Sequence, residues 1–370
     1  MGKSSPPVTR ELVLDALRDV QDPELHRSIV ELDMVRDVAI LDGIVRVDAL
    51  LTISACPLRE TIIDSIKAKV QALPGVRQVE VALGVMSQEQ RQGLIHKLHG
   101  AGEGPQRHSA FLGPDSRTRV VAVASGKGGV GKSTVTVNLA AALAQLGHRV
   151  GIIDADVYGF SIPKMLGVTG RPTVIDNMII PLEKDGIRVI SIGFMLPDEN
   201  QVVIWRGPLL HKTVTTFIGE VHWGDDLEYL LIDLPPGTGD VSISIAQTLP
   251  QSFMLIVTTP QEAAVHVAQR AAKMAEKVNM EVSGVIENMS YFQTAPGAPP
   301  IYIFGRGGGA TLARQLGVPL LGEVPLDQAV REGGDVGQPI VLSAPESLAA
   351  QALRQAAKRL REIVPLPTTV

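Results

Sequence analysis

The chain has 370 residues, of which 45% are hydrophobic and 20% are charged, and its formal net charge is -5. This length exceeds one small core, so two domains are expected, and the ordinary composition indicates a globular protein. The negative net charge argues against a nucleic-acid partner held through a general basic field.

The single cysteine, Cys56, and the polar N-terminal segment bear on the cellular compartment. One cysteine excludes an intrachain disulfide and suits a reducing cytosol, so we expect a cytoplasmic protein. The N-terminal segment lacks the apolar core of a signal peptide. No apolar run approaches the ~20 residues of a membrane helix.

The first part of the chain carries alternating helix and strand signals. Helical spacing runs over residues 9–20, and two short apolar runs then flank Asp42-Gly43, a strong hairpin signal. A second helix opens at Pro57 and ends before Pro74-Gly75. An alternating strand over residues 76–83 completes a compact α–β–β–α–β unit.

These signals predict three parts of the chain. Residues 1–91 form a small α+β domain, and residues 92–117, rich in Gly, His, Pro, Ser and Arg, form a linker. From residue 118 to 370, short buried strands alternate with helices. We therefore predict an α/β domain with a parallel sheet and helices on both faces, whose ligands lie at the carboxyl ends of the strands.

A glycine-rich loop after the first strand of this second domain carries the strongest functional signal. It fits the phosphate-binding pattern G-x-x-x-x-G-K-S, in which backbone N–H groups and a helix N-terminus surround the phosphates. Lys132 would neutralise the β and γ phosphates of ATP, and Ser133 would ligate Mg²⁺. The alternative is a glycine-rich turn without a ligand. The predicted nucleotide contacts are Gly126, Lys127, Gly128, Gly129, Val130, Gly131, Lys132, Ser133 and Thr134.

Two carboxylate clusters follow the next strands. Asp156 would orient the attacking water, and Asp154, two residues earlier, would support the metal shell. Asp233 ends an apolar strand, as a Walker B aspartate does, and would hold Mg²⁺ through water. For each aspartate the alternative is a strand-end cap or a turn residue.

Several further strings complete a combination that points to one family. They are GKGGVGKST, DADVYGFSIPKMLG, WRGP, LLIDLPPGTGD, VTTPQ, ENMSYF, FGRGGG and VPLD. In this combination the sequence resembles the Mrp/Nbp/ApbC-type iron–sulfur cluster carrier ATPases, relatives of MinD and of the nitrogenase iron protein. The first domain, with Asp22-Pro23-Glu24-Leu25 and residues 51–57, resembles the MIP-type domain of iron–sulfur assembly factors.

The resemblance implies a homodimer with two nucleotides at its interface. Lys127 marks the deviant form of the P-loop, in which this lysine reaches the nucleotide of the facing subunit; its spacing alone shows only an extra cation. The resemblance also places Asn288 and Pro325 at the adenine, with a local turn as the alternative for Asn288. Apo iron–sulfur proteins or assembly factors would be the partners.

The sequence departs from this family at the cluster ligands. Cluster-carrying members have a Cys-x-x-Cys after the Ser-Tyr-Phe segment, and here Thr294 and Gly297 occupy those places. Neither residue replaces a thiolate on iron, so the bridging cluster is not expected there. Cys56 is the remaining soft ligand. It lies before Pro57 at a helix start, which favours the thiolate, and the alternative is a small buried hydrophobe.

Two functions therefore remain open. The first is a dimeric ATP-hydrolysing switch that binds or transfers iron–sulfur clusters, or assists their assembly. The second is a nucleotide-dependent adaptor or positioning ATPase of the MinD/ParA type that holds no cluster. The terminal helix over residues 346–363 is amphipathic and basic, but docking on its own domain is a simpler account than membrane binding.

Overall fold

The structure is a computed structural model that describes residues 8–53, 58–99, 116–157, 159–196, 207–237, 243, 245, 248–249, 251–295 and 297–367. The chain divides into two compact units. The first comprises Met1–Arg107 with Val174–Ile180, and the second comprises His108–Thr173 with Pro181–Val370. The predicted succession of a small α+β domain and a larger α/β domain is confirmed.

The first unit is built on a three-stranded sheet in the order β1-β2-β3. Strand β1 (Val35–Leu41) runs antiparallel to β2 (Ile44–Leu51), and β2 runs parallel to β3 (Gln78–Val85). Asp42 and Gly43 join β1 to β2 with φ values of 48° and 76°. Two successive positive φ values are typical of the type I′ turn that suits the twist of a hairpin. The predicted hairpin is confirmed.

Three helices belong to the first unit: α1 (Arg10–Arg18), α2 (Arg59–Gln71) and α3 (Gln88–His99). The hydroxyl of Thr9 accepts a hydrogen bond from Leu12 N at 3.3 Å and so caps α1. The prediction of a linker from residue 92 was wrong for residues 92–99, which continue α3. Leu94 and Leu98 lie one turn apart on that helix and are both 2% exposed, so their burial stabilises it.

A hairpin distant in sequence completes the first unit. Strands β6 (Thr173–Ile175) and β7 (Met178–Ile180) form a separate two-stranded sheet. Three of their buried apolar residues belong to the same hydrophobic cluster as residues of α1, β2 and α2. These residues are Ile175, Met178 and Ile180, none more than 3% exposed. The sequence had placed this hairpin within the second domain.

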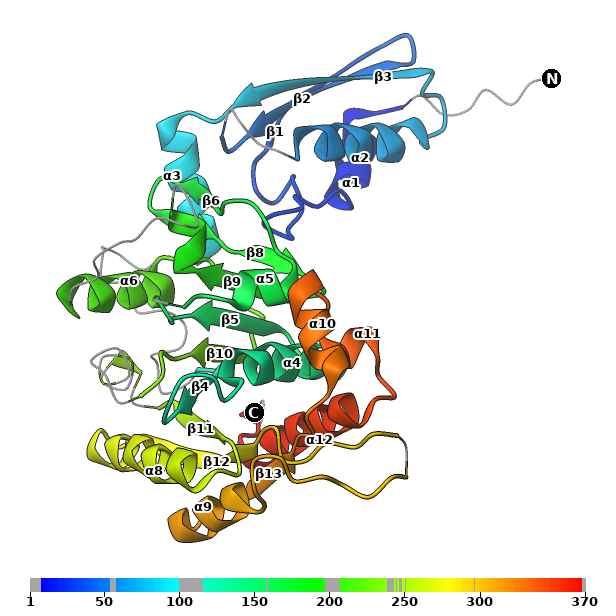
Figure 1. Ribbon diagram of the computed structural model, residues 1–370. Coiled ribbons are helices and arrows are strands. Elements are labelled where there is room, and N and C mark those ends of the chain that lie inside the picture. The colour runs from blue at the N-terminus through cyan, green and yellow to red at the C-terminus, as the bar shows by residue number, and fades with distance from the viewer. Residues whose placement is uncertain are drawn as a thin grey trace. The chain divides into compact units, whose positions relative to one another are not determined.

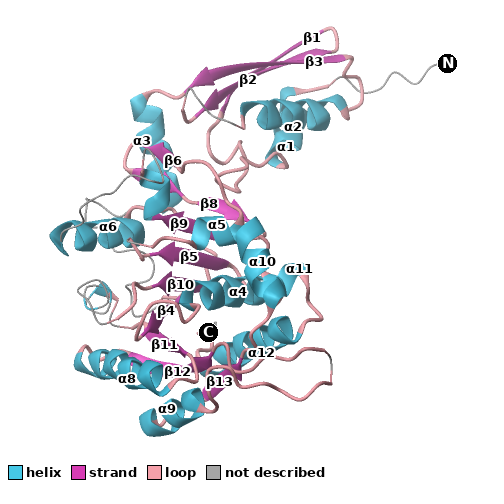
Figure 2. Cartoon of the chain, in the orientation of Figure 1, coloured by secondary structure: helices cyan, strands magenta, loops and turns pink. Residues whose placement is uncertain are grey.

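The second unit contains an eight-stranded sheet in the order β13-β12-β11-β4-β10-β5-β9-β8 (Figure 1). All its strands are parallel except β8, which pairs antiparallel with β9; the arrows of β5, β9 and β10 point the same way in Figure 2. The strands are β4 (Arg119–Ser125), β5 (Val150–Asp154), β8 (Leu182–Lys184), β9 (Ile187–Ser191), β10 (Tyr229–Asp233), β11 (Phe253–Thr258), β12 (Glu281–Glu287) and β13 (Leu320–Glu323).

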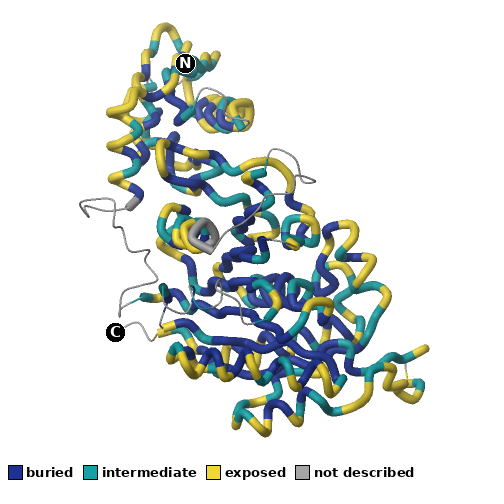
Figure 3. Tube along the Cα trace, turned by 60° about the vertical axis from the view of Figure 1, so that its left-hand side comes forward, coloured by how far each residue is buried: buried dark blue, intermediate teal, exposed yellow. Residues whose placement is uncertain are grey.

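Helices pack against this sheet as the alternating pattern predicted. On the basis of their contacts, α4, α11 and α12 form one group, while α8 and α9 form another that packs on β11 and β12. Every residue of β5 and β10 is buried, and the buried stretches of the chain are the dark blue parts of the tube in Figure 3. The described helices and short 3-10 turn are α4 (Lys132–Gln145), α5 (Ile162–Leu166), η1 (Ile192–Met195), α6 (Gly207–Gly219), α8 (Glu262–Lys277), α9 (Gly308–Leu316), α10 (Gln328–Val336), α11 (Ile340–Ser343) and α12 (Leu348–Ile363).

The terminal helix α12 docks on its own unit. Its apolar side, including Leu353 and Leu360, is buried, and the helix contacts α4 and β13. The guanidinium of Arg359 donates to the backbone oxygen of Leu321 at 3.0 Å. Docking within the unit is therefore the arrangement that the structure shows. In the described ranges, no helix combines the length and apolarity that crossing a bilayer requires.

Candidate nucleotide-binding site

The carboxyl ends of three neighbouring strands form the base of the site. Strand β10 lies between β4 and β5, and its last residue, Asp233, is directly opposite Asp154 at the end of β5. Both carboxylates are completely buried. The glycine loop leaves β4 at this same edge and leads into α4. The structure thus brings the predicted loop and both strand-end aspartates together, where open α/β sheets bind ligands.

Two glycines give the loop its shape. Gly129 and Gly131 have φ values of 78° and 79°, a left-handed conformation that side chains with a Cβ rarely adopt. Gly131 is the N-cap of α4, so the helix begins at Lys132. The first N–H groups of a helix have no intrahelical partner. They and the helix dipole make this end of α4 suitable for a phosphate.

A compact set of hydrogen bonds joins the start of α4 to Asp233. Lys132 Nζ lies 2.7 Å from Asp233 Oδ2, in an ion pair whose side chains are 6% and 0% exposed. The hydroxyl of Ser133 donates to the same oxygen at 2.6 Å. The hydroxyl of Thr136 donates to Asp233 Oδ1 at 2.8 Å. This arrangement holds the two predicted phosphate and magnesium residues against the predicted Walker B aspartate.

Thr136 is a further residue at this site, one that was not predicted from the sequence. It lies one helical turn after Lys132, so its side chain points to the same face of α4 and reaches Asp233. The spacing Lys-x-x-x-Thr on a helix that opens at a P-loop was the signal that could have identified it. Thr136 fixes the second oxygen of Asp233 and is itself completely buried.

Asp154 closes the neighbouring loop rather than facing the cavity. Its Oδ2 accepts from the backbone N of Ser161 at 3.1 Å, the N of Ile162 at 3.2 Å and the hydroxyl of Ser191 at 3.1 Å. Burial, followed by the charge of Asp233, raises the pKa of Asp154 to about 7, while Lys132 opposes this shift. The carboxylate therefore ties both ends of the segment from residue 161 to 191 beneath the site.

The surface above these residues is hollowed into a cavity of about 230 Å³. Asp156 lines it, as the predicted water-orienting role requires, together with Ser161, Met165 and Pro236. From the loop, Lys127, Gly128, Gly129, Val130, Gly131, Lys132, Ser133 and Thr134 also line this cavity. The cavity thus gathers polar and cationic groups at the start of α4, beside the carboxylate of Asp156.

Asn288 and Pro325 lie together at the ends of β12 and β13. The backbone N of Ser290 donates to Val324 O at 2.9 Å, which joins the two segments, and Pro325 is buried. The side-chain amide of Asn288 donates to Val130 O at 2.9 Å. A Cβ on Gly131 would lie 2.2 Å from this amide nitrogen. Asn288 therefore fixes the glycine loop in this structure, and its predicted contact with adenine stays a prediction.

Lys127 projects from the loop toward α8. Its ammonium donates to the side-chain oxygen of Gln261 at 2.8 Å, and both residues are half-buried. Gln261 is the last residue of the VTTPQ string, and the sequence alone assigns no role to it. This contact lies within one chain, whereas the resemblance implied a contact across a dimer.

In the cluster-carrying proteins that this sequence resembles, one segment carries the two cysteines. Here the same segment forms a loop that is closed by hydrogen bonds. Phe292 and Ile301 exchange two backbone hydrogen bonds of 2.8 Å, and Gln293 Nε2 donates to Ala298 O at 2.8 Å. Thr294 and Gly297 lie in this loop. Cys56 lies outside the described residues. Asp22, which the MIP-type motif had singled out, accepts from the backbone N of Glu24 and of Leu25 at 2.9 Å, so it caps a turn.

Comparisons with known proteins agree with this geometry. Residues 116–361 match the family described as NUBPL iron-transfer P-loop NTPases, and residues 10–82 match the family described as iron–sulfur cluster assembly proteins. A protein from Mycobacterium tuberculosis named iron–sulfur cluster carrier protein is 48% identical over 352 residues, 93% of this chain and 91% of that protein. A relative of the same name from Synechocystis is 44% identical over 365 residues, 95% of this chain and 97% of that protein.

Solved structures show the same fold. A nucleotide-binding protein from Archaeoglobus fulgidus in complex with ADP is 39% identical, with a TM-score of 0.54 over 62% of this chain and 89% of that one. The cell division ATPase MinD from Pyrococcus furiosus, at 24% identity and a TM-score of 0.50, covers 66% of this chain and 99% of its own, and shares the fold. The chain therefore belongs to the family of NUBPL-type iron-transfer P-loop NTPases.

Proposed function

We propose that this chain is a dimeric ATPase that binds or transfers iron–sulfur clusters, or assists their assembly, for apoproteins. The observation that supports ATP binding and hydrolysis is the contact of Lys132 and Ser133, at the start of α4, with Asp233 at the end of β10. A buried ammonium, a hydroxyl and a carboxylate in this order are the groups that a magnesium-bound triphosphate needs. The relatives named iron–sulfur cluster carrier proteins support the cargo.

The residues present fit a magnesium ion. Ser133 Oγ and Asp233 Oδ2 lie 2.6 Å apart, and hydroxyl and carboxylate oxygens are the donors that Mg²⁺ prefers. Ser133 would hold the ion directly and Asp233 through water, with Asp154 supporting them from beneath. The bound ion would supply positive charge next to the terminal phosphates.

Hydrolysis in this proposal is an in-line attack of water on the γ-phosphate. Asp156 orients the water from the wall of the cavity, and the N–H groups of the loop and Lys132 stabilise the negative charge that develops on the phosphate oxygens. Lys127 of the facing subunit adds a second ammonium. Asn288 and Pro325 hold the adenine beside the loop.

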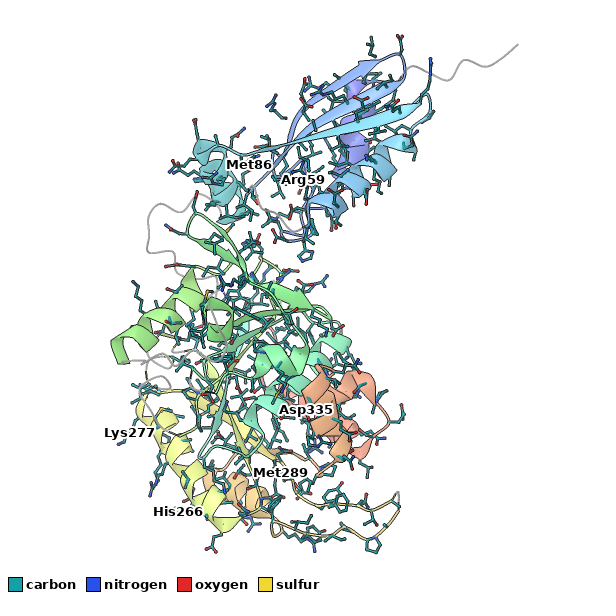
Figure 4. The ribbon with its side chains drawn as sticks, turned by 45° about the horizontal axis from the view of Figure 1, so that its top comes forward. Arg59, Met86, His266, Lys277, Met289 and Asp335 are labelled. Carbon is teal, nitrogen blue, oxygen red and sulfur yellow. The ribbon has the colours of Figure 1, made fainter. Side chains whose placement is uncertain are left out.

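The nucleotide site is tested by replacing Lys132. In Lys132→Ala the affinity for ATP, measured by calorimetry, should fall by about 30- to 100-fold, the effect of losing a charge-assisted contact with phosphate. The matched control is Lys277→Ala, because Lys277 is exposed at the C-terminal end of α8 (Figure 4). Unchanged ATP affinity in a folded Lys132→Ala variant would refute the site.

The second candidate is a nucleotide-dependent adaptor that holds no cluster. The sequence favours it because Thr294 and Gly297 stand where the resembled carriers have cysteines. Anaerobic reconstitution with iron and sulfide, followed by visible absorption, separates the two functions. The carrier proposal expects a chromophore in the wild type that Cys56→Ala loses. An absorption spectrum without any cluster band would favour the adaptor, and an identical band in Cys56→Ala would remove Cys56 as a ligand.

A further inference from the structure

The contact between Lys127 and Gln261 joins the glycine loop to the start of α8. Lys127 Nζ donates to Gln261 Oε1 at 2.8 Å. Among the residues that the structure describes, Lys127 forms no ion pair within 4.0 Å, whereas Lys132 is paired with buried Asp233. Lys127 is therefore held by a neutral amide, whereas Lys132 is held by a carboxylate.

Backbone packing fixes the distance between the two elements. A Cβ on Gly126 would lie 2.4 Å from the backbone N of Ala268 and 2.5 Å from the carbonyl carbon of Val267. No side chain fits between the loop and α8 at this point. The residue next to Gly126 is Lys127, so the ammonium reaches Gln261 from a backbone that α8 itself holds in place.

Gln261 does not contribute a side-chain cap to its own helix. It occupies the N-cap of α8, with φ -59° and ψ 130°, and its side chain makes no capping hydrogen bond. The backbone carbonyl of Gln261 does accept from the N of Ala264 and of Val265. Serine, threonine, aspartate and asparagine are the usual side chains that cap a helix at this position. The side chain of Gln261 is instead directed to Lys127.

We propose that Gln261 is a positioning residue that holds the Lys127 ammonium within the single chain and releases it when a second copy with bound ATP approaches. This inference rests on the proposed function, in which Lys127 acts on the nucleotide of the facing subunit. A hydrogen bond between a charged and a neutral group changes an equilibrium constant by about tenfold. A hydrogen bond of this strength can hold Lys127 in the single chain, and the stronger attraction of a triphosphate can replace it.

The test uses two replacements of Gln261 in the full chain. Gln261→Met keeps the length of the side chain but removes the acceptor, and Gln261→Glu replaces the amide with a carboxylate. Self-association in the presence of a slowly hydrolysed ATP analogue is measured by sedimentation. The Met variant should associate about three- to tenfold more tightly, and the Glu variant at least about tenfold more weakly.

A matched control separates this contact from a general effect of charge. Gln269→Glu adds the same charge to α8, but Gln269 hydrogen-bonds Gln315 and not Lys127. It should change association by less than about twofold, as expected for a half-buried charge that does not hydrogen-bond Lys127. Thermal unfolding of all three variants verifies that the helix is retained.

Lys127→Ala makes the two possible failures distinguishable. If this variant associates and hydrolyses ATP like the wild type, the proposed action across a dimer is wrong. If it loses nucleotide-dependent association, both Gln261 variants should have no further effect in its background. The role of Gln261 would be wrong if its variants still changed association in the absence of Lys127. It would also be wrong if the Met and Glu variants changed association in the same direction or not at all. Neither outcome would contradict the ATPase proposal.

Discussion

The two units of the chain complete their apolar cores in different ways. The second unit covers both faces of an eight-stranded sheet with helices of its own. The first unit has a three-stranded sheet, and its core includes Ile175, Met178 and Ile180 from a hairpin that follows residues 108–173 in the sequence. A small unit buries a smaller fraction of its surface than a large one. Three apolar side chains therefore matter more to the first unit than to the second.

Ile175→Ala is the strongest test of this comparison. Ile175 is 1% exposed, and removing a buried isoleucine side chain to alanine costs about 2 to 4 kcal/mol. Hydrogen exchange at the amides of α2 should report this loss, whereas amides of α4 should be unaffected. Val174→Ala is the control because Val174 is 48% exposed on the same strand. Equal protection of α2 in the two variants would show that the first unit does not depend on the hairpin.

Gly131→Ala tests whether the loop of the second unit is specified by contacts within that unit. Both Gly131 and Gly129 have positive φ, so alanine at either position costs about 1 to 2 kcal/mol of backbone strain. At Gly131 the new Cβ would also collide with Asn288, whereas at Gly129 nothing lies within 4 Å. ATP affinity should therefore fall at least about tenfold further in Gly131→Ala than in Gly129→Ala. Equal affinities would remove Asn288 as the residue that fixes the loop.

The pH dependence of stability offers a third test, in the second unit. The pKa of Asp154 is raised from 3.8 to about 7 by burial and by Asp233. Between about pH 4 and pH 7 the folded chain retains a proton that the unfolded chain has lost, so this group contributes less stability as the pH rises. The free energy of unfolding should fall by at most about 1.4 kcal/mol per pH unit across this range.

Asp154→Asn should remove this slope from the unfolding of the second unit. The difference in unfolding free energy between wild type and variant, measured in urea at several pH values, should shrink between about pH 4 and pH 7 and be constant above. Hydrogen exchange at α2 should show no such trend. A difference that does not vary with pH would contradict the raised pKa.

The smallest expected effect concerns the ion pair between Arg91 and Asp176, which lies within the first unit. Its charged atoms are 3.2 Å apart, with side chains 24% and 32% exposed, and Arg91 also donates to Met86 O. Arg91→Met should cost less than about 1 kcal/mol in the protection of α2. Lys69→Met, at the more exposed pair with Asp19, should cost still less. A larger effect for Lys69 would mean that burial does not rank these pairs.

Local signals predicted the parts of the fold and site that depend on neighbouring residues. Asp42-Gly43 identified the hairpin, and the glycine pattern identified the loop at Lys132 because both depend on backbone geometry within a few residues. The sequence could not reveal that the hairpin at Ile175 joins the first unit, since apolar residues do not specify which core they enter. It also missed Thr136 and Gln261, whose roles arise from contacts with Asp233 and Lys127, more than 90 positions away.

The hairpin has a consequence for the connectivity of the molecule. The backbone passes from one unit to the other three times, after residues 107, 173 and 180, instead of once as a simple fusion would. A chain cut once between residues 107 and 108 would still carry Ile175, Met178 and Ile180 as an anchor for the N-terminal fragment. The two fragments should therefore co-purify after such a cut, and exchanging the first unit with that of a relative requires the hairpin to be exchanged with it.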